Sequence, residues 1–207
     1  EDKLINKAMG GMDFADTWSG DRLRAGSISY NLGVIFAWMR LIDTTGMTKE
    51  EMEHHRRIYA GHCFMHDVMN AYMVPFNTID ESVPPVSWGM NDDRVVFWPY
   101  WSSGDVVTVN SPDVKVSAWT LPACGEPGRT ARVLLCVFNY SKAATADAVV
   151  QVELAKVGVA LPDGAAASDI EKVEGSASVD VNKDKAKVSV HVGPRDYRLI
   201  SLAAPVK

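Results

Sequence analysis

Three carboxylates and a tryptophan lie close together near the beginning of the chain, and their residue types suit carbohydrate binding. Carboxylates accept hydrogen bonds from sugar hydroxyls, and the apolar face of a tryptophan can stack on the C–H groups of a pyranose ring. Two arginines that follow could bind a carboxylate or sulfate group. The candidate substrate-binding residues are Asp13, Asp16, Trp18, Asp21, Arg22 and Arg24. Residues 13–24 are therefore the part of the sequence that could line a glycan cleft.

The same segment also has an ordinary structural interpretation. Aspartate is common in turns for local reasons, so Asp16 and Asp21 could be a loop acid and a helix cap. Arg22 and Arg24 could form surface ion pairs with these carboxylates. Glycoside cleavage needs two carboxyl groups about 5–9 Å apart across the scissile bond. No catalytic residue can be assigned from these spacings alone.

Two histidines have a spacing that could bind a metal ion. His62 and His66 are four residues apart on an expected helix, and His55 lies one heptad before His62. The segment contains no H-E-x-x-H sequence and no clear third ligand. We therefore interpret the pair as buried polar residues and expect neither a metal nor another cofactor.

The composition excludes several classes of partner. The chain has 207 residues with a net charge of −5, which argues against general binding to nucleic-acid phosphates. It contains no run of about 18 apolar residues, so we expect no membrane partner. The odd number of cysteines and the lack of C-x-x-C spacing favour small apolar side chains, although a Cys124–Cys136 bridge between neighbouring strands stays open.

The hydrophobic period changes near residue 92, from helical before it to alternating after it. Residues 27–42 are apolar on nearly every face, which predicts a buried helix. Thr48 and Glu51 match a capping box at the start of a second helix over residues 48–73, and Pro75 ends it. Residues 76–92 are rich in Pro, Asp, Ser and Asn and are expected to form a loop or linker. The sequence thus predicts a helical segment over residues 1–91.

Eight short segments after residue 92 have strand patterns separated by turn residues, which is typical of an antiparallel sandwich. Alternation in residues 188–192 predicts one buried and one wet face, and residues 164–168 are expected to be a flexible loop. The expected fold class is α+β, with a helical N-terminal part at 1–91 and a C-terminal β-sandwich at 92–207. The expected strands cover residues 95–101, 105–109, 114–121, 133–140, 148–154, 176–181, 187–192 and 197–202.

Aromatic residues gather where the strand pattern begins. They could form a sugar-stacking platform, or they could fill the interface between the sandwich and a neighbouring domain. Trp98 and Tyr100 would share one strand face, with Phe97 and Trp101 on the other, so one set is expected to be buried in either case. Trp88 and Trp119 belong to the same candidate group.

Four phrases occur in an order that resembles a known group of proteins: FADTWSGD (14–21), FWPYW (97–101), VFNYS (137–141) and PRDYRLI (194–200). They resemble the C-terminal portion of large glycoside-hydrolase-like proteins and are similar to glycoside hydrolase family 123 and its relatives. The resemblance implies a (β/α)-barrel followed by a β-sandwich, with residues 1–74 as the last one or two βα units of the barrel. A complete barrel needs about 250 residues. The chain would then be a fragment, a cleavage product or a shortened relative.

The resemblance also implies a carbohydrate-active function, with a glycan substrate, the rest of the barrel or a companion chain as partners, and a secreted or periplasmic location. In family 123 the acetamido group of the sugar acts as nucleophile beside an Asp-Glu pair. Residues 1–91 hold no such pair in a barrel-strand context, so we expect the chain alone to lack a complete acid/base pair. The alternatives are a non-catalytic structural or accessory subunit of a larger assembly, and a carbohydrate-binding module.

Overall fold

A computed structural model describes residues 21, 36–37, 46–67, 69–70, 87–90, 92–124, 130–162, 164–171, 177–181 and 184–204. The chain divides into two compact units, Glu1–Thr78 and Ile79–Lys207. No helix in the described ranges combines the length and the apolar character that crossing a bilayer requires.

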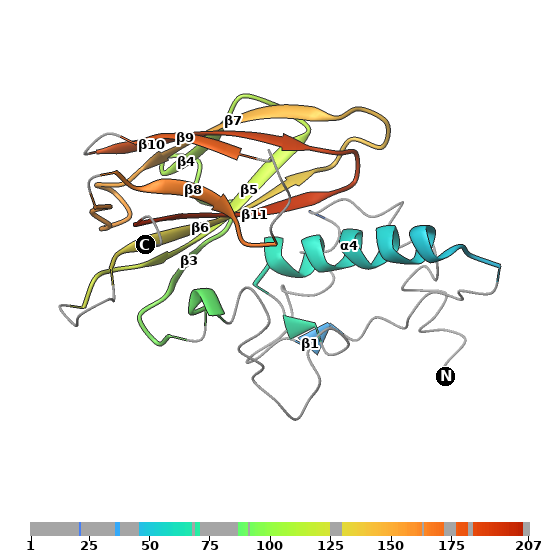
Figure 1. Cartoon of the computed structure of the whole chain (residues 1–207), viewed down its shortest axis with the longest axis horizontal. Coiled ribbons are helices and arrows are strands. Elements are labelled where there is room, and N and C mark those ends of the chain that lie inside the picture. Colours follow the sequence, from blue (N-terminus) through green and yellow to red (C-terminus); the bar gives the residue numbers. More distant parts are fainter. Residues whose placement is uncertain are drawn as a thin grey trace. The chain divides into compact units, whose positions relative to one another are not determined.

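The first unit contains a parallel pair of short strands, β1 (Phe36–Ala37) and β2 (Met69–Asn70). Helix α4 (Lys49–Met65) lies between them in sequence (Figure 1). Parallel neighbours need a long crossover connection, and a helix is the usual one. The first unit is therefore a β-α-β arrangement in its described part.

The predicted helix over residues 27–42 is wrong at Phe36–Ala37, which form strand β1. A segment that is apolar on every side fits a buried helix, but it equally fits a parallel strand covered on both faces. Periodicity cannot separate the two, because neither has a wet face. The rest of this predicted helix lies outside the described residues.

The predicted capping box at the start of α4 is confirmed. The Thr48 hydroxyl accepts a hydrogen bond from the Glu51 backbone N–H at 3.2 Å, and the Thr48 N–H donates to the Glu51 carboxylate at 2.7 Å. The bond from the Thr48 backbone N–H lowers the pKa of Glu51, because it stabilises the charged carboxylate. The beginning of the helix is thus set by two residues three positions apart.

The end of α4 comes earlier than predicted, at Met65 instead of near residue 73. The His66 N–H donates to the Cys63 carbonyl at 3.2 Å, which tightens the last turn. Asp67 then adopts a φ of 53°, a left-handed conformation that stops the helix. The apolar positions beyond Met65 kept a helical spacing in the sequence, so the spacing alone did not reveal this stop.

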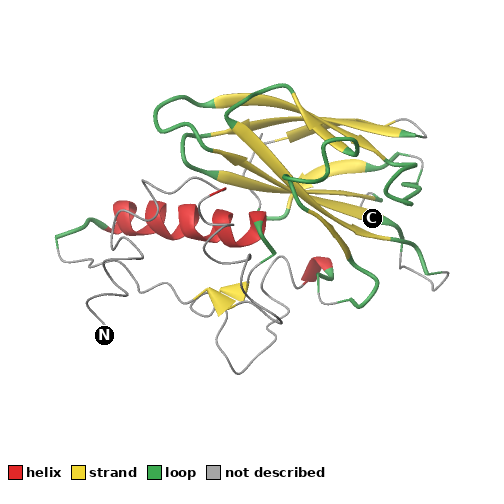
Figure 2. Ribbon diagram, turned by 180° about the vertical axis from the view of Figure 1, so that it is seen from behind, coloured by secondary structure: helices red, strands yellow, loops and turns green. Residues whose placement is uncertain are grey.

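The second unit is an antiparallel β-sandwich, which confirms the predicted sandwich. One sheet has four strands in the order β4-β7-β10-β9, and the other has five in the order β3-β5-β6-β11-β8. Figure 2 shows the strands as two stacked layers. The strands are β3 (Val96–Trp98), β4 (Val107–Val109), β5 (Val114–Leu121), β6 (Arg132–Asn139), β7 (Ala146–Glu153), β8 (Ala166–Asp169), β9 (Ala177–Val181), β10 (Lys185–Val192) and β11 (Tyr197–Ala203).

The core lies between the two sheets and is built mainly from valines. Strand β10 alternates strictly between exposed and buried side chains, so all its apolar residues point to one face. The neighbouring strand β7 places Ala148, Val150 and Val152 on the same face. The facing sheet contributes Val116, Val133, Leu135, Val137, Ile200 and Leu202.

Two strand predictions are corrected by the structure. Residues 164–168 were predicted to be a loop, but Ala166–Asp169 form β8 and pair with β11. Alanine and serine have only a weak preference for strands, so their side chains do not specify one here. The pairing with β11 stabilises the strand instead. Strand β3 ends at Trp98 instead of residue 101, because the Tyr100 N–H donates to the Ser117 hydroxyl and the Pro99 carbonyl accepts from the Ser102 and Ser103 N–H groups in a turn.

Candidate functional site

Of the six predicted substrate-binding residues, the structure describes Asp21, whose side chain is exposed. Asp13, Asp16, Trp18, Arg22 and Arg24 lie outside the described residues. The glycan cleft at residues 13–24 therefore stays a prediction.

The two histidines at metal-binding spacing are buried near the end of α4, with His62 0% and His66 4% exposed. The His66 Nδ1 lies 2.7 Å from the carbonyl oxygen of His62 and donates to it, so one ring nitrogen is used within the helix. Within the described ranges, no three His, Cys, Asp or Glu side chains gather as a metal site would require. Cys124 and Cys136 are not joined by a disulfide, so the bridge that the sequence left open is not formed.

The most distinctive surface of the sandwich is the outer face of its five-stranded sheet. Cross-strand register places large apolar side chains there, on the side opposite the core. Those on β5, β6 and β11 are at most 2% exposed. The apolar outer face consists of Phe97, Trp119, Leu134, Cys136, Phe138, Tyr197 and Leu199, together with Ser201.

The outer face of the four-stranded sheet is different in character. Its outward positions on β7 and β10 include Asp147, Lys187, Ser189 and His191, all of them exposed. The His191 Nδ1 and the Asp147 carboxylate form a cross-strand pair at 2.7 Å. The outer face of the four-stranded sheet is therefore polar and exposed to solvent, whereas the outer face of the five-stranded sheet is apolar and packed.

Trp88 lies against the apolar outer face and is held there by polar contacts. Its Nε1 donates to the Ser201 hydroxyl at 3.0 Å, and the Arg132 guanidinium lies 5.3 Å from its ring centre. Gly89 follows with a φ of 103°, and a Cβ there would come within 2.7 Å of the Arg132 Nη2. The Arg132 guanidinium could move aside, so it is the positive φ that favours glycine at this position.

The aromatic residues at the beginning of the five-stranded sheet pack on both of its faces. Phe97 contacts Trp119 on the outer side, with ring centres 5.1 Å apart. Trp98 faces the core, and its Nε1 donates to the Thr120 hydroxyl at 3.0 Å. Among the tryptophans that the structure describes, all are buried or half-buried, including Trp101.

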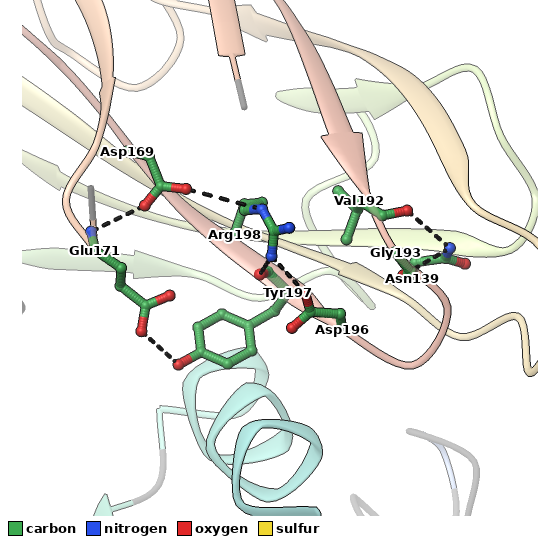
Figure 3. Close-up of polar contacts among 8 residues, drawn as sticks. All are labelled: Asn139, Asp169, Glu171, Val192, Gly193, Asp196, Tyr197 and Arg198. Atoms are coloured by element: carbon green, nitrogen blue, oxygen red, sulfur yellow. Dashed lines mark hydrogen bonds and ion pairs between the residues drawn. The ribbon is translucent and has the colours of Figure 1, made fainter. Parts of the chain in front are cut away.

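A polar cluster ties β11 to β8 at one end of the sheet (Figure 3). The Arg198 Nη1 donates to the Asp196 carboxylate at 2.5 Å, and its Nε lies 3.9 Å from the carboxylate of Asp169, which is 2% exposed. The Tyr197 hydroxyl donates to the Glu171 carboxylate at 2.8 Å. Two carboxylates thus surround one guanidinium. These ion pairs hold the end of the sheet together, and the cluster contains no evident reactive group.

Asn139 fixes the end of β6 and is completely buried. Its Nδ2 lies 2.8 Å from the Ala144 carbonyl, 3.0 Å from the Gly193 carbonyl and 3.3 Å from the Val192 carbonyl. Its Oδ1 accepts from the Ser141 N–H at 3.0 Å. The asparagine therefore joins two loops at one end of the sandwich, as Figure 3 shows in part.

The fold defines the second unit as a two-layer antiparallel β-sandwich domain. No protein-family model matches the chain, and no curated protein matches it. Among solved structures it is similar to a GH27 β-L-arabinopyranosidase from Geobacillus stearothermophilus in complex with arabinose, with 21% identity and a TM-score of 0.28. The match covers 46% of this chain and 18% of that enzyme's chain, so it spans about a fifth of the enzyme. A similarity at this level carries no argument about activity, and membership of family 123 stays a prediction.

Proposed function

We propose that the chain is part of a carbohydrate-active protein of glycoside-hydrolase type, in which the sandwich supports a (β/α)-barrel and residues 13–24 line a glycan cleft. The observation that carries the proposal is the order of its elements. The parallel β1-α4-β2 arrangement precedes an antiparallel sandwich in the sequence. A barrel consists of parallel strands connected by helices, so this order is the one expected at the end of a barrel followed by a C-terminal sandwich.

The apolar outer face supports the role of the sandwich as a packing domain. Each large apolar side chain gains about 1.5–3 kcal/mol when it is removed from water, so a face with several of them is stable only when it is covered. An isolated sandwich would be expected to carry a polar outer face, as the four-stranded sheet does. In this structure the large apolar side chains of the face on β5, β6 and β11 are at most 2% exposed, so the chain itself already covers them, as expected of a packing surface.

The alternative functions differ in what they need from the sandwich. A carbohydrate-binding module of the platform type needs an exposed, flat aromatic face, whereas the described tryptophans are buried or half-buried. A non-catalytic accessory subunit could be built on the same sandwich, so the fold alone does not exclude it. Catalysis by the proposed enzyme would require carboxyl groups from the rest of the barrel.

Glycan binding by variants of the predicted cleft tests the proposal. Trp18→Ala removes the stacking surface and Asp16→Asn removes a charged acceptor, so both should weaken binding on a glycan array without changing the thermal unfolding midpoint. Asp180→Asn makes the same charge change at an exposed position of β9 and should bind like the wild type. Unchanged glycan affinity in both cleft variants would rule out the cleft assignment.

A further inference from the structure

A groove of about 310 Å³ opens between β4 and β5, at the edge of the sandwich. The groove exists because both sheets stop at this edge. Strand β4 is the last strand of its sheet, and β3 pairs only with the second half of β5, at Ala118–Thr120. The first half of β5 therefore has no strand neighbour on this side among the described residues.

Backbone groups from both strands are directed to the groove. The Asn110 N–H donates to the Val149 carbonyl, and the Val106 carbonyl accepts from Glu153, so even-numbered residues of β4 bond to β7. Because alternate residues of an edge strand face outward, Val109 directs its N–H and C=O to the open side. The same alternation applies to Val116 of β5, and both residues line the groove.

The side chains give the groove an apolar floor and a polar rim. Val107 and Val116, which are 7% and 4% exposed, form the floor, while the half-buried Tyr100 forms part of the wall. The Asn110 Oδ1 accepts from the Val149 N–H at 2.7 Å, which orients this amide at the rim. Ser111 and Lys115 add a hydroxyl and an ammonium group.

We propose that this groove binds one neutral sugar ring. A pyranose has an apolar C–H face that suits the valines and Tyr100, and its hydroxyls both donate and accept, as backbone N–H, C=O and the Ser111 hydroxyl do. The volume is at the lower end of ligand pockets, which fits a single ring. The choice of a sugar among small neutral ligands rests on the proposed function.

An extended peptide is the main competing occupant, since open strand edges can accept a further strand. Two features disfavour it here. Strand β4 is only three residues long, so it offers too short a ladder for stable pairing. Pro112 and the charged Lys115 border the groove, and both residue types protect edges against strand addition.

Saturation-transfer NMR on the full chain, with methyl glycosides of glucose, galactose and N-acetylglucosamine as probes, tests the groove. Tyr100→Ala should weaken binding by about fivefold, since an aromatic contact contributes on the order of 1 kcal/mol and 1.4 kcal/mol corresponds to tenfold. Ser111→Trp, on an accessible turn, should block the groove and abolish the signal. Ser189→Trp, at an exposed position of the four-stranded sheet, is the matched control and should bind like the wild type.

Trp18→Ala separates the groove from the predicted cleft. Sugar binding that persists in Trp18→Ala and is lost in Ser111→Trp supports the groove, whatever happens to the cleft. Binding lost only in Trp18→Ala overturns the groove and leaves the proposed function standing. Absence of binding by all three probes, or binding of a short extended peptide that Ser111→Trp abolishes while sugars fail to compete, also overturns the groove.

Discussion

Replacing Asn139 by alanine should destabilise the sandwich far more than a typical polar substitution. The side-chain amide has two N–H groups, so two of the three nearby carbonyls receive full hydrogen bonds and the third shares one. The Ser141 N–H adds a third bond. At a net value of about 1 kcal/mol for each bond, Asn139→Ala should lose about 3 kcal/mol of unfolding free energy.

Urea unfolding followed by tryptophan fluorescence measures this loss, because Trp98 and Trp119 are embedded in the sandwich. With a slope of about 2 kcal/mol per molar urea, the midpoint of Asn139→Ala should fall by about 1.5 M. Asn110→Ala is the control, because this asparagine accepts one hydrogen bond at an exposed position and should cost about 1 kcal/mol or less. Equal losses in the two variants would refute the reasoning that burial and bond number set the cost.

Two further predictions concern local contacts. Thr48→Ala removes the cap of α4 and should lower helix stability by about 1 kcal/mol, seen as faster amide exchange in the first turn of α4 with unchanged exchange in β6; unchanged exchange in α4 would contradict the capping role. The bonds from Lys185 and then Gln151 lower the pKa of Glu153, so their contribution is present above the unfolded pKa of about 4.3 and is lost as pH falls through the folded pKa. Glu153→Gln should therefore flatten the decline of the urea midpoint below about pH 4 relative to the wild type, and parallel pH profiles would exclude this linkage.

The features that could be predicted from the sequence are those determined within a few residues. Strand β5 has the predicted bounds, 114–121, and β10 extends the predicted 187–192 by two residues. In β10 the strict alternation of side chains records which face is buried. The capping box at Thr48 is equally local, because its two partners lie three residues apart. Such signals need no knowledge of the rest of the fold.

Two of the missed features depend on a partner strand far away in the chain. Phe36–Ala37 are a strand because they pair with Met69–Asn70, more than thirty residues later. Ala166–Asp169 are a strand because β11 offers its edge, and their own side chains favour no particular structure. The early end of α4 has a different cause, a left-handed Asp67 that periodicity does not record.

The apolar outer face shows why packing surfaces are easier to find in a sequence than chemistry. Residues 133–138 are apolar without interruption, and such a run predicts a strand buried on both faces. Cross-strand register then places Trp119 and Tyr197 beside this strand on the same face. The apolar run at 133–138 therefore indicates the position of the apolar outer face. A catalytic pair needs only two carboxylates brought together from distant positions, and two residues leave no periodic trace. The sandwich was therefore predictable from its sequence, whereas the glycan cleft depends on the experiment with Trp18 and Asp16.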